Sequence, residues 1–118
     1  MARFLVNVVT GPENTTRAAL GFLIARTAAE EGHEVTLFLA GDAVAFVRSE
    51  TAEAAHGVGT GSVAEHLAAA REAGATLLLS GLSSKARGLT SELAGGAELV
   101  PPQRLVELAA GADTVLVY

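Results

Sequence analysis

Four short runs of almost continuously apolar residues recur along the chain, at 3–9, 34–40, 75–80 and 113–118. Strands that are buried on both faces have such runs, whereas a strand with one face in water alternates apolar and polar residues. The segments between the runs have helical patterns, and this alternation is typical of a parallel sheet covered by helices on both sides. A brief additional strand at 97–100 brings the expected number of strands to five.

The segments between the strands carry recognisable helix start and stop signals. Ser62 and Glu65 match a capping box, in which a hydroxyl and a carboxylate satisfy the first amides of a helix. Gly32 and Gly74 suit helix ends, and Pro101-Pro102 suits a first helical turn. We expect helices at 13–32, 42–55, 62–73, 83–89 and 101–110. The predicted fold class is therefore α/β, a three-layer α/β/α sandwich with a five-stranded parallel sheet.

Length and composition narrow the class of protein further. The 118 residues suffice for one domain, 1–118, and leave no room for a second core. The absence of cysteine excludes disulfides, a thiolate metal site and a cysteine nucleophile, and a net charge of −5 argues against a nucleic-acid partner. No apolar stretch reaches the roughly 20 residues of a membrane span, and the first run is too short for a secretory signal. We therefore expect a cytoplasmic protein with no membrane partner.

The helix expected at 13–32 is apolar on two sides. Its alanines, leucines, Phe22 and Ile24 point in nearly every direction at 100° per residue. One apolar side would pack on the sheet, and the other favours contact with another subunit, so we expect a homo-oligomer. The alternative is that small alanine side chains form a tolerable, weakly apolar surface.

Polar residues gather at the predicted carboxyl ends of the strands. Ligands of open α/β sheets bind outside these ends, where helix N-termini direct amides and a positive dipole. Thr10–Thr16, Ala40–Asp42 and Ser80–Gly88 meet there, with Lys85 and Arg87 suited to a small anion. The candidate ligand-binding residues are Asn7, Gly11, Glu13, Asn14, Asp42, Ser80, Ser83, Lys85 and Arg87. The alternatives are ordinary helix capping by Thr10 or Asn14 and a solvated charged turn.

Other kinds of site find little support. The G-x-S-x-G motif of serine hydrolases is absent around Ser83, and no two histidines have metal-ligand spacing. We place His33 in the turn before the second strand and His66 on a helix surface, and we expect neither a metal nor a cofactor. His56 precedes a glycine-rich segment, 57–61, which follows a helix rather than a strand. We therefore interpret it as a mobile loop near the site, with dinucleotide binding a remote option.

The order of these segments resembles a known family. GPENTTRAALGFLIARTAAEEGHEVTLFLAGDAV (11–44), SGLSSKARG (80–88) and AELVPPQRLVELAAGADTVLVY (97–118) together look like the DsrE/DsrF-like family. The resemblance covers nearly the whole chain. It implies a small cytoplasmic α/β protein that assembles as a trimer or hexamer. Its best understood members pass persulfide sulfur along a relay.

The resemblance also implies where the sulfur would be carried. In sulfur-transferring members a cysteine ends the third strand, before a short helix that closes with Arg-Gly. This segment aligns with SGLSSKARG, so Ser80 stands in the position of the cysteine and Arg87-Gly88 on the Arg-Gly. A serine hydroxyl cannot hold a persulfide, and we assign no catalytic residue.

Three functions stay open at the level of sequence. The chain can be a homo-oligomeric binding or accessory protein for a small anionic or thiol ligand. It can be an enzyme that uses a hydroxyl or an externally supplied thiol at the same pocket. It can also be a structural subunit whose activity depends on a paralogous sulfur-relay partner with the cysteine.

Overall fold

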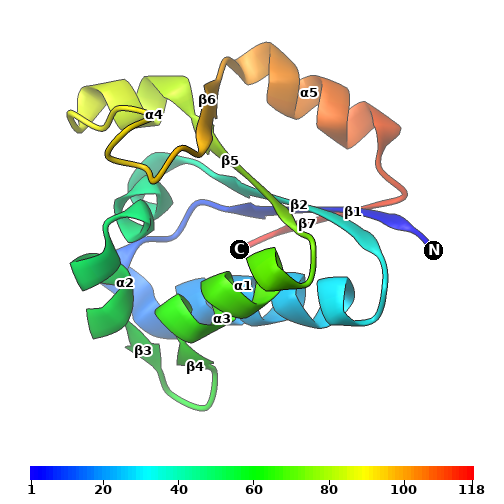
Figure 1. Ribbon diagram of the computed structural model, residues 1–118, viewed down its shortest axis with the longest axis horizontal. Coiled ribbons are helices and arrows are strands. Elements are labelled where there is room, and N and C mark those ends of the chain that lie inside the picture. Colours follow the sequence, from blue (N-terminus) through cyan, green and yellow to red (C-terminus); the bar gives the residue numbers. More distant parts are fainter.

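The fold is described from a computed structural model that covers all residues, 1–118. Its main sheet has five strands in the spatial order β6-β5-β2-β1-β7, and every pair of neighbours is parallel (Figure 1). The strands are β1 (Arg3–Val8), β2 (Glu34–Leu39), β5 (Thr76–Ser80), β6 (Glu98–Val100) and β7 (Thr114–Val117). The predicted five-stranded parallel sheet is thus confirmed.

Helices lie on both sides of this sheet. They are α1 (Thr15–Glu30), α2 (Ser49–Ala54), α3 (Val63–Glu72), α4 (Gly81–Ala86) and α5 (Pro102–Gly111), with 3₁₀ turns η1 (Pro12–Asn14) and η2 (Gly41–Val47). Figure 1 shows α1 and α3 below the sheet and α5 above it. The order in which the chain visits the strands explains which helices lie on which side of the sheet. Successive right-handed crossovers from β1 to β5 step along the sheet in one direction, and the return from β6 to β7 puts α5 on the opposite face.

The face covered by α1 and α3 holds most of the core. One cluster of 22 buried residues joins this face to the helices, with Phe22 and Phe46 in edge-to-face contact at 5.6 Å between ring centroids. The second apolar side of α1 packs against α3 within the same chain. Contact with α3 thus explains part of the two-sided pattern within one subunit, although Leu20, Leu23 and Ile24 remain partly exposed. Alanines on α1, including Ala18 and Ala25, let the neighbouring elements approach closely.

The face covered by α5 is much thinner. Its buried residues are Leu5, Phe38, Leu78 and Val100, and no residue of α5 itself is buried. Strand β7 forms one edge of the sheet, and its Val115 and Val117 are exposed by 44% and 60%. Its apolar run had indicated burial on both faces. The run is instead an edge strand that α5 leaves partly uncovered.

The glycine-rich segment, which we interpreted as a mobile loop, forms a short hairpin. Strands β3 (His56–Gly57) and β4 (Gly61–Ser62) pair antiparallel, and the hairpin packs against α1. The Val58 amide donates to Thr16 Oγ1 at 3.0 Å, and His66 Nε2 lies 2.7 Å from the Thr60 carbonyl oxygen. His66 is only 8% exposed, so its predicted place on a helix surface is wrong. These bonds hold the segment on the helical layer.

Candidate functional site at the carboxyl edge

Ser80 lies where β5 ends and α4 begins, as the sequence indicated. It is the N-cap of α4, and its Oγ accepts a hydrogen bond from the Ser83 amide at 3.1 Å. The side chain is half-buried. A group at this position therefore meets a helix-terminal amide, which favours negative charge.

The end of β2 contributes a second set of contacts to the same place. The Gly41 amide donates to Ser83 Oγ at 2.8 Å. Arg87 Nη2 forms an ion pair with Asp42 Oδ1 at 2.7 Å, and Arg87 Nη1 donates to the Ser83 carbonyl at 3.0 Å. Four predicted site residues thus come together here, although Asp42 already occupies the guanidinium that was expected to serve an anion.

The end of β1 borders this cluster through Gly11. A Cβ atom on Gly11 would overlap the Asp42 carbonyl group, so only glycine fits there without a shift. The Gly11 amide donates to Glu13 Oε1 at 2.9 Å. Asn14 is the N-cap of α1 and accepts from the Arg17 amide at 3.1 Å, which agrees with the capping interpretation of this segment.

Two predicted site residues take no part in these contacts. Lys85 is exposed and forms no ion pair. Asn7 lies within β1, in register with Phe38 and Val117, and its Oδ1 is buried without a hydrogen-bond partner. It is the second-last residue of β1 and so lies near the carboxyl edge, but its side chain forms no hydrogen bond with the residues around Ser80.

No histidine accompanies Ser80. His33 Nδ1 accepts from the Ala2 amide at 3.0 Å, His56 contacts the Glu53 carbonyl, and His66 is held by Thr60. A serine nucleophile needs a base within hydrogen-bond reach. The arrangement provides helix-terminal amides, hydroxyls and a paired cation, which are groups suited to binding.

The fold and this edge define a class of protein, a small α/β protein with one five-stranded parallel sheet and polar loops at the carboxyl ends of its strands. The chain belongs to the DsrE/DsrF-like family, whose model matches residues 3–118. It is similar to the ychN protein from E. coli, with a TM-score of 0.82, 19% identity and full coverage of both chains. A conserved protein of unknown function from Bacteroides thetaiotaomicron gives a TM-score of 0.73 and 14% identity, covering 99% of this chain and 95% of that one. No curated protein matches the chain.

These likenesses confirm the expected family and the three-layer α/β fold. The structural neighbours are less than 25% identical to this chain, so their likeness is evidence for the fold only. None of the helices is both long enough and apolar enough to cross a lipid bilayer.

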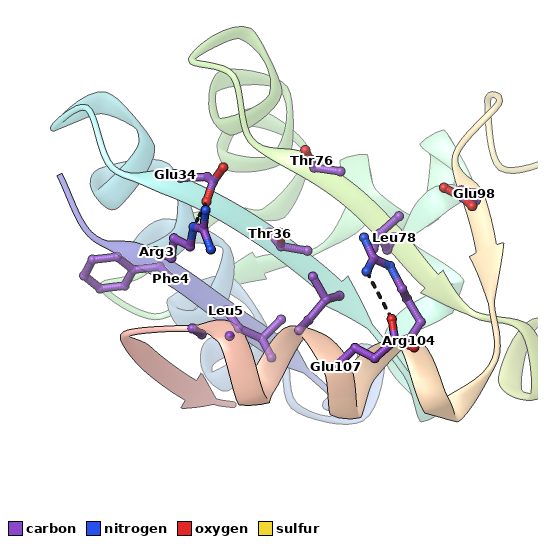
Figure 2. A pocket seen from close by; sticks show the side chains of 13 residues that line it. Arg3, Phe4, Leu5, Glu34, Thr36, Thr76, Leu78, Glu98, Arg104 and Glu107 are labelled. Atoms are coloured by element: carbon purple, nitrogen blue, oxygen red, sulfur yellow. Dashed lines mark hydrogen bonds and ion pairs between the residues drawn. The ribbon is translucent and has the colours of Figure 1, made fainter.

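One feature of the opposite, amino edge was missed from the sequence. A cavity of about 420 Å³ lies there, between α5 and the strands (Figure 2). Thr36 within β2 and Thr76 at the start of β5 lie at paired positions of two largely apolar strands. The sequence shows the two threonines but not their shared register, which only the structure reveals.

Proposed function

We propose that the chain is a cytoplasmic, homo-oligomeric accessory protein that binds a small anion or thiol compound at the carboxyl edge of its sheet. The observation that carries this proposal is the junction of Ser80, Ser83, Gly41 and the Asp42–Arg87 pair around the start of α4. Family membership supports it, because the resemblance aligns Ser80 with the cysteine of sulfur-transferring members. Without a thiol, the chain holds no persulfide and transfers no sulfur by itself.

The ion pair gives a direct test of anion binding. Because Asp42 competes with a ligand for Arg87, Asp42→Asn should increase affinity for thiosulfate, and Arg87→Ala should decrease it. We expect about threefold in each direction for these exposed groups. Isothermal titration of thiosulfate into the wild type and both variants measures this. Equal affinity in all three proteins would refute a site at this pair.

A cysteine placed at position 80 tests the electrostatics of the same site. In Ser80→Cys we expect the thiol to have a pKa below the roughly 8.5 of a free cysteine, because its thiolate would accept from the Ser83 amide. The shift should be on the order of one unit and should shrink in Ser80→Cys/Arg87→Ala, since that change leaves Asp42 unpaired.

Alkylation rate against pH gives the midpoint for each variant. Val58→Cys, at an 87% exposed position on the hairpin, is the matched control for a free thiol. A midpoint for Ser80→Cys at or above that of Val58→Cys would show that no favourable potential exists at the end of β5.

Exposed valines support the oligomeric part of the proposal. Val9, Val115 and Val117 are 41%, 44% and 60% exposed, and β7 is an open edge of the sheet. Apolar residues at a sheet edge are usually covered in the assembled protein. We propose that other copies cover them in a trimer or hexamer.

Sedimentation velocity at micromolar concentration tests the assembly. Val117→Asp should shift the protein toward the monomer of 11.9 kDa, and Val58→Asp should leave the assembly unchanged. A wild-type protein that sediments as a monomer would refute the oligomer.

The alternative is a subunit that acts only with a cysteine-bearing paralogue. Leu82, beside Ser80 at the start of α4, is 67% exposed and would suit a partner over this edge. Leu82→Asp should then abolish co-purification with the paralogue while the homo-oligomer persists. Co-purification that survives Leu82→Asp would argue against this contact.

A further inference from the structure

The amino edge of the sheet holds the cavity of about 420 Å³, at the far end of the strands from Ser80. Its floor is formed by residues near the amino ends of β1, β2, β5 and β6, and α5 covers it with residues from Arg104 to Gly111 (Figure 2). Pockets for small organic molecules commonly range from about 300 to 1,000 Å³. The space is therefore large enough for a small organic molecule.

Two threonines make the floor of this cavity polar. Thr36 of β2 and Thr76 of β5 are direct neighbours in the sheet, and Figure 2 shows both on the floor of the cavity. The next residues on the same face, Phe38 and Leu78, are buried and apolar. The polar part of the floor therefore lies toward the amino ends of β2 and β5, and Gly111 at the end of α5 also lines the cavity.

The charged residues around the cavity leave one carboxylate without a counter-charge. Arg3 pairs with Glu34 at 2.8 Å, and Arg104 pairs with Glu107 at 3.4 Å. Figure 2 marks interactions among the lining residues only within these two pairs. Glu98, in the edge strand β6, takes part in none of the chain's ion pairs. The lining therefore has three acidic and two basic side chains, and its unbalanced charge is negative.

We propose that this cavity binds a small organic cation, an alkylamine or alkylguanidine, with its charged group at Glu98. The hydroxyls of Thr36 and Thr76 would accept further N–H groups, and Leu5, Leu78 and Leu108 would contact the alkyl part. The net charge of −5 favours the approach of a cation over that of an anion. These apolar walls and the volume favour an organic cation over a bare metal ion.

Agmatine, which has a guanidinium at one end and an ammonium at the other, is a suitable probe. We expect saturable binding to the intact protein in the millimolar range or tighter, followed by ¹H–¹⁵N shifts of backbone amides. The shifts should concentrate at Thr36, Thr76, Glu98 and the second half of α5. Glutarate, of similar size but anionic, should produce no saturable shift there.

Three variants make the test specific. Glu98→Gln should weaken agmatine binding about tenfold by removing the charge, and Thr76→Val should weaken it a few-fold by removing a hydroxyl. Both residues are exposed, so the fold should persist. Glu53→Gln, which removes an exposed charge on α2, should leave affinity unchanged. Absence of saturable binding, shifts centred elsewhere, or equal losses in Glu98→Gln and Glu53→Gln would overturn the proposal.

Discussion

The two faces of the central sheet are built very differently. On the α1–α3 face, 22 buried residues form one cluster, and seven residues of α1 are themselves buried. On the α5 face, the buried cluster has four residues, and α5 contributes only half-buried side chains such as Leu105 and Leu108. Apolar burial is the main stabilising contribution to folding. Most of the stability must therefore come from one face.

The unequal packing suggests different roles for the two faces, one for binding and one for stability. The loosely packed α5 face leaves space between the helix and the sheet, which the closely packed α1–α3 face does not. The cavity under α5 and the exposed valines of β7 both lie on the α5 face. Sites for ligands and partners are drawn from the less stable parts of a fold. The α1–α3 face, by contrast, is the scaffold that holds the strand ends in place.

Truncation of a large side chain on the scaffold face should have the greatest effect. Phe22 is fully buried and contacts Phe46 edge to face. We expect Phe22→Ala to lower the free energy of unfolding by about 3–5 kcal/mol, because it removes apolar burial and leaves a cavity. Urea denaturation followed by circular dichroism measures the change. A loss below about 1 kcal/mol would contradict the unequal division of stability.

The corresponding truncation on the thin face should cost less. Leu108 of α5 is half-buried beside the four-residue cluster. We expect Leu108→Ala to lower the free energy of unfolding by about 1–2 kcal/mol, less than for a fully buried leucine. If the same urea experiment gave a loss equal to that of Phe22→Ala, the two faces would contribute alike.

Much of this architecture could be predicted because it depends on local pattern. Apolar runs predicted the strands, and capping signals predicted the helix starts, as at Ser62, whose Oγ accepts from the Glu65 amide at 3.2 Å. The element that packs on an apolar face could not be predicted in this way. The sequence indicates that α1 has two apolar sides, but not that α3 covers one of them. The exposed strand β7 was mistaken for a buried one for the same reason.

The candidate site likewise has one part that could be predicted from the sequence and one part that could not. The position of Ser80 at a strand end follows from the order of strand and helix, so it could be predicted. The ion pair between Asp42 and Arg87 joins residues 45 positions apart, and it changes the expected role of the arginine. No local pattern indicates such a pairing. The cavity at the amino edge required knowledge of which threonines are neighbours across two strands.

The smallest predicted effect concerns a buried hydroxyl on α4, the short helix that follows the carboxyl end of β5. Ser84 is fully buried, and its Oγ has no hydrogen-bond partner. Ser84→Ala removes the unsatisfied group and introduces a better helix former, while the void left by one oxygen is small. We expect the free energy of unfolding to rise by about 0.5–1 kcal/mol.

Ser91→Ala is the matched control with the opposite sign, since Ser91 Oγ donates to the Ala97 carbonyl at 3.2 Å and that bond would be lost. Thermal and urea unfolding of both variants decide the matter. A loss of stability in Ser84→Ala would contradict this prediction and would mean that the hydroxyl is satisfied inside the chain, for example by a buried water.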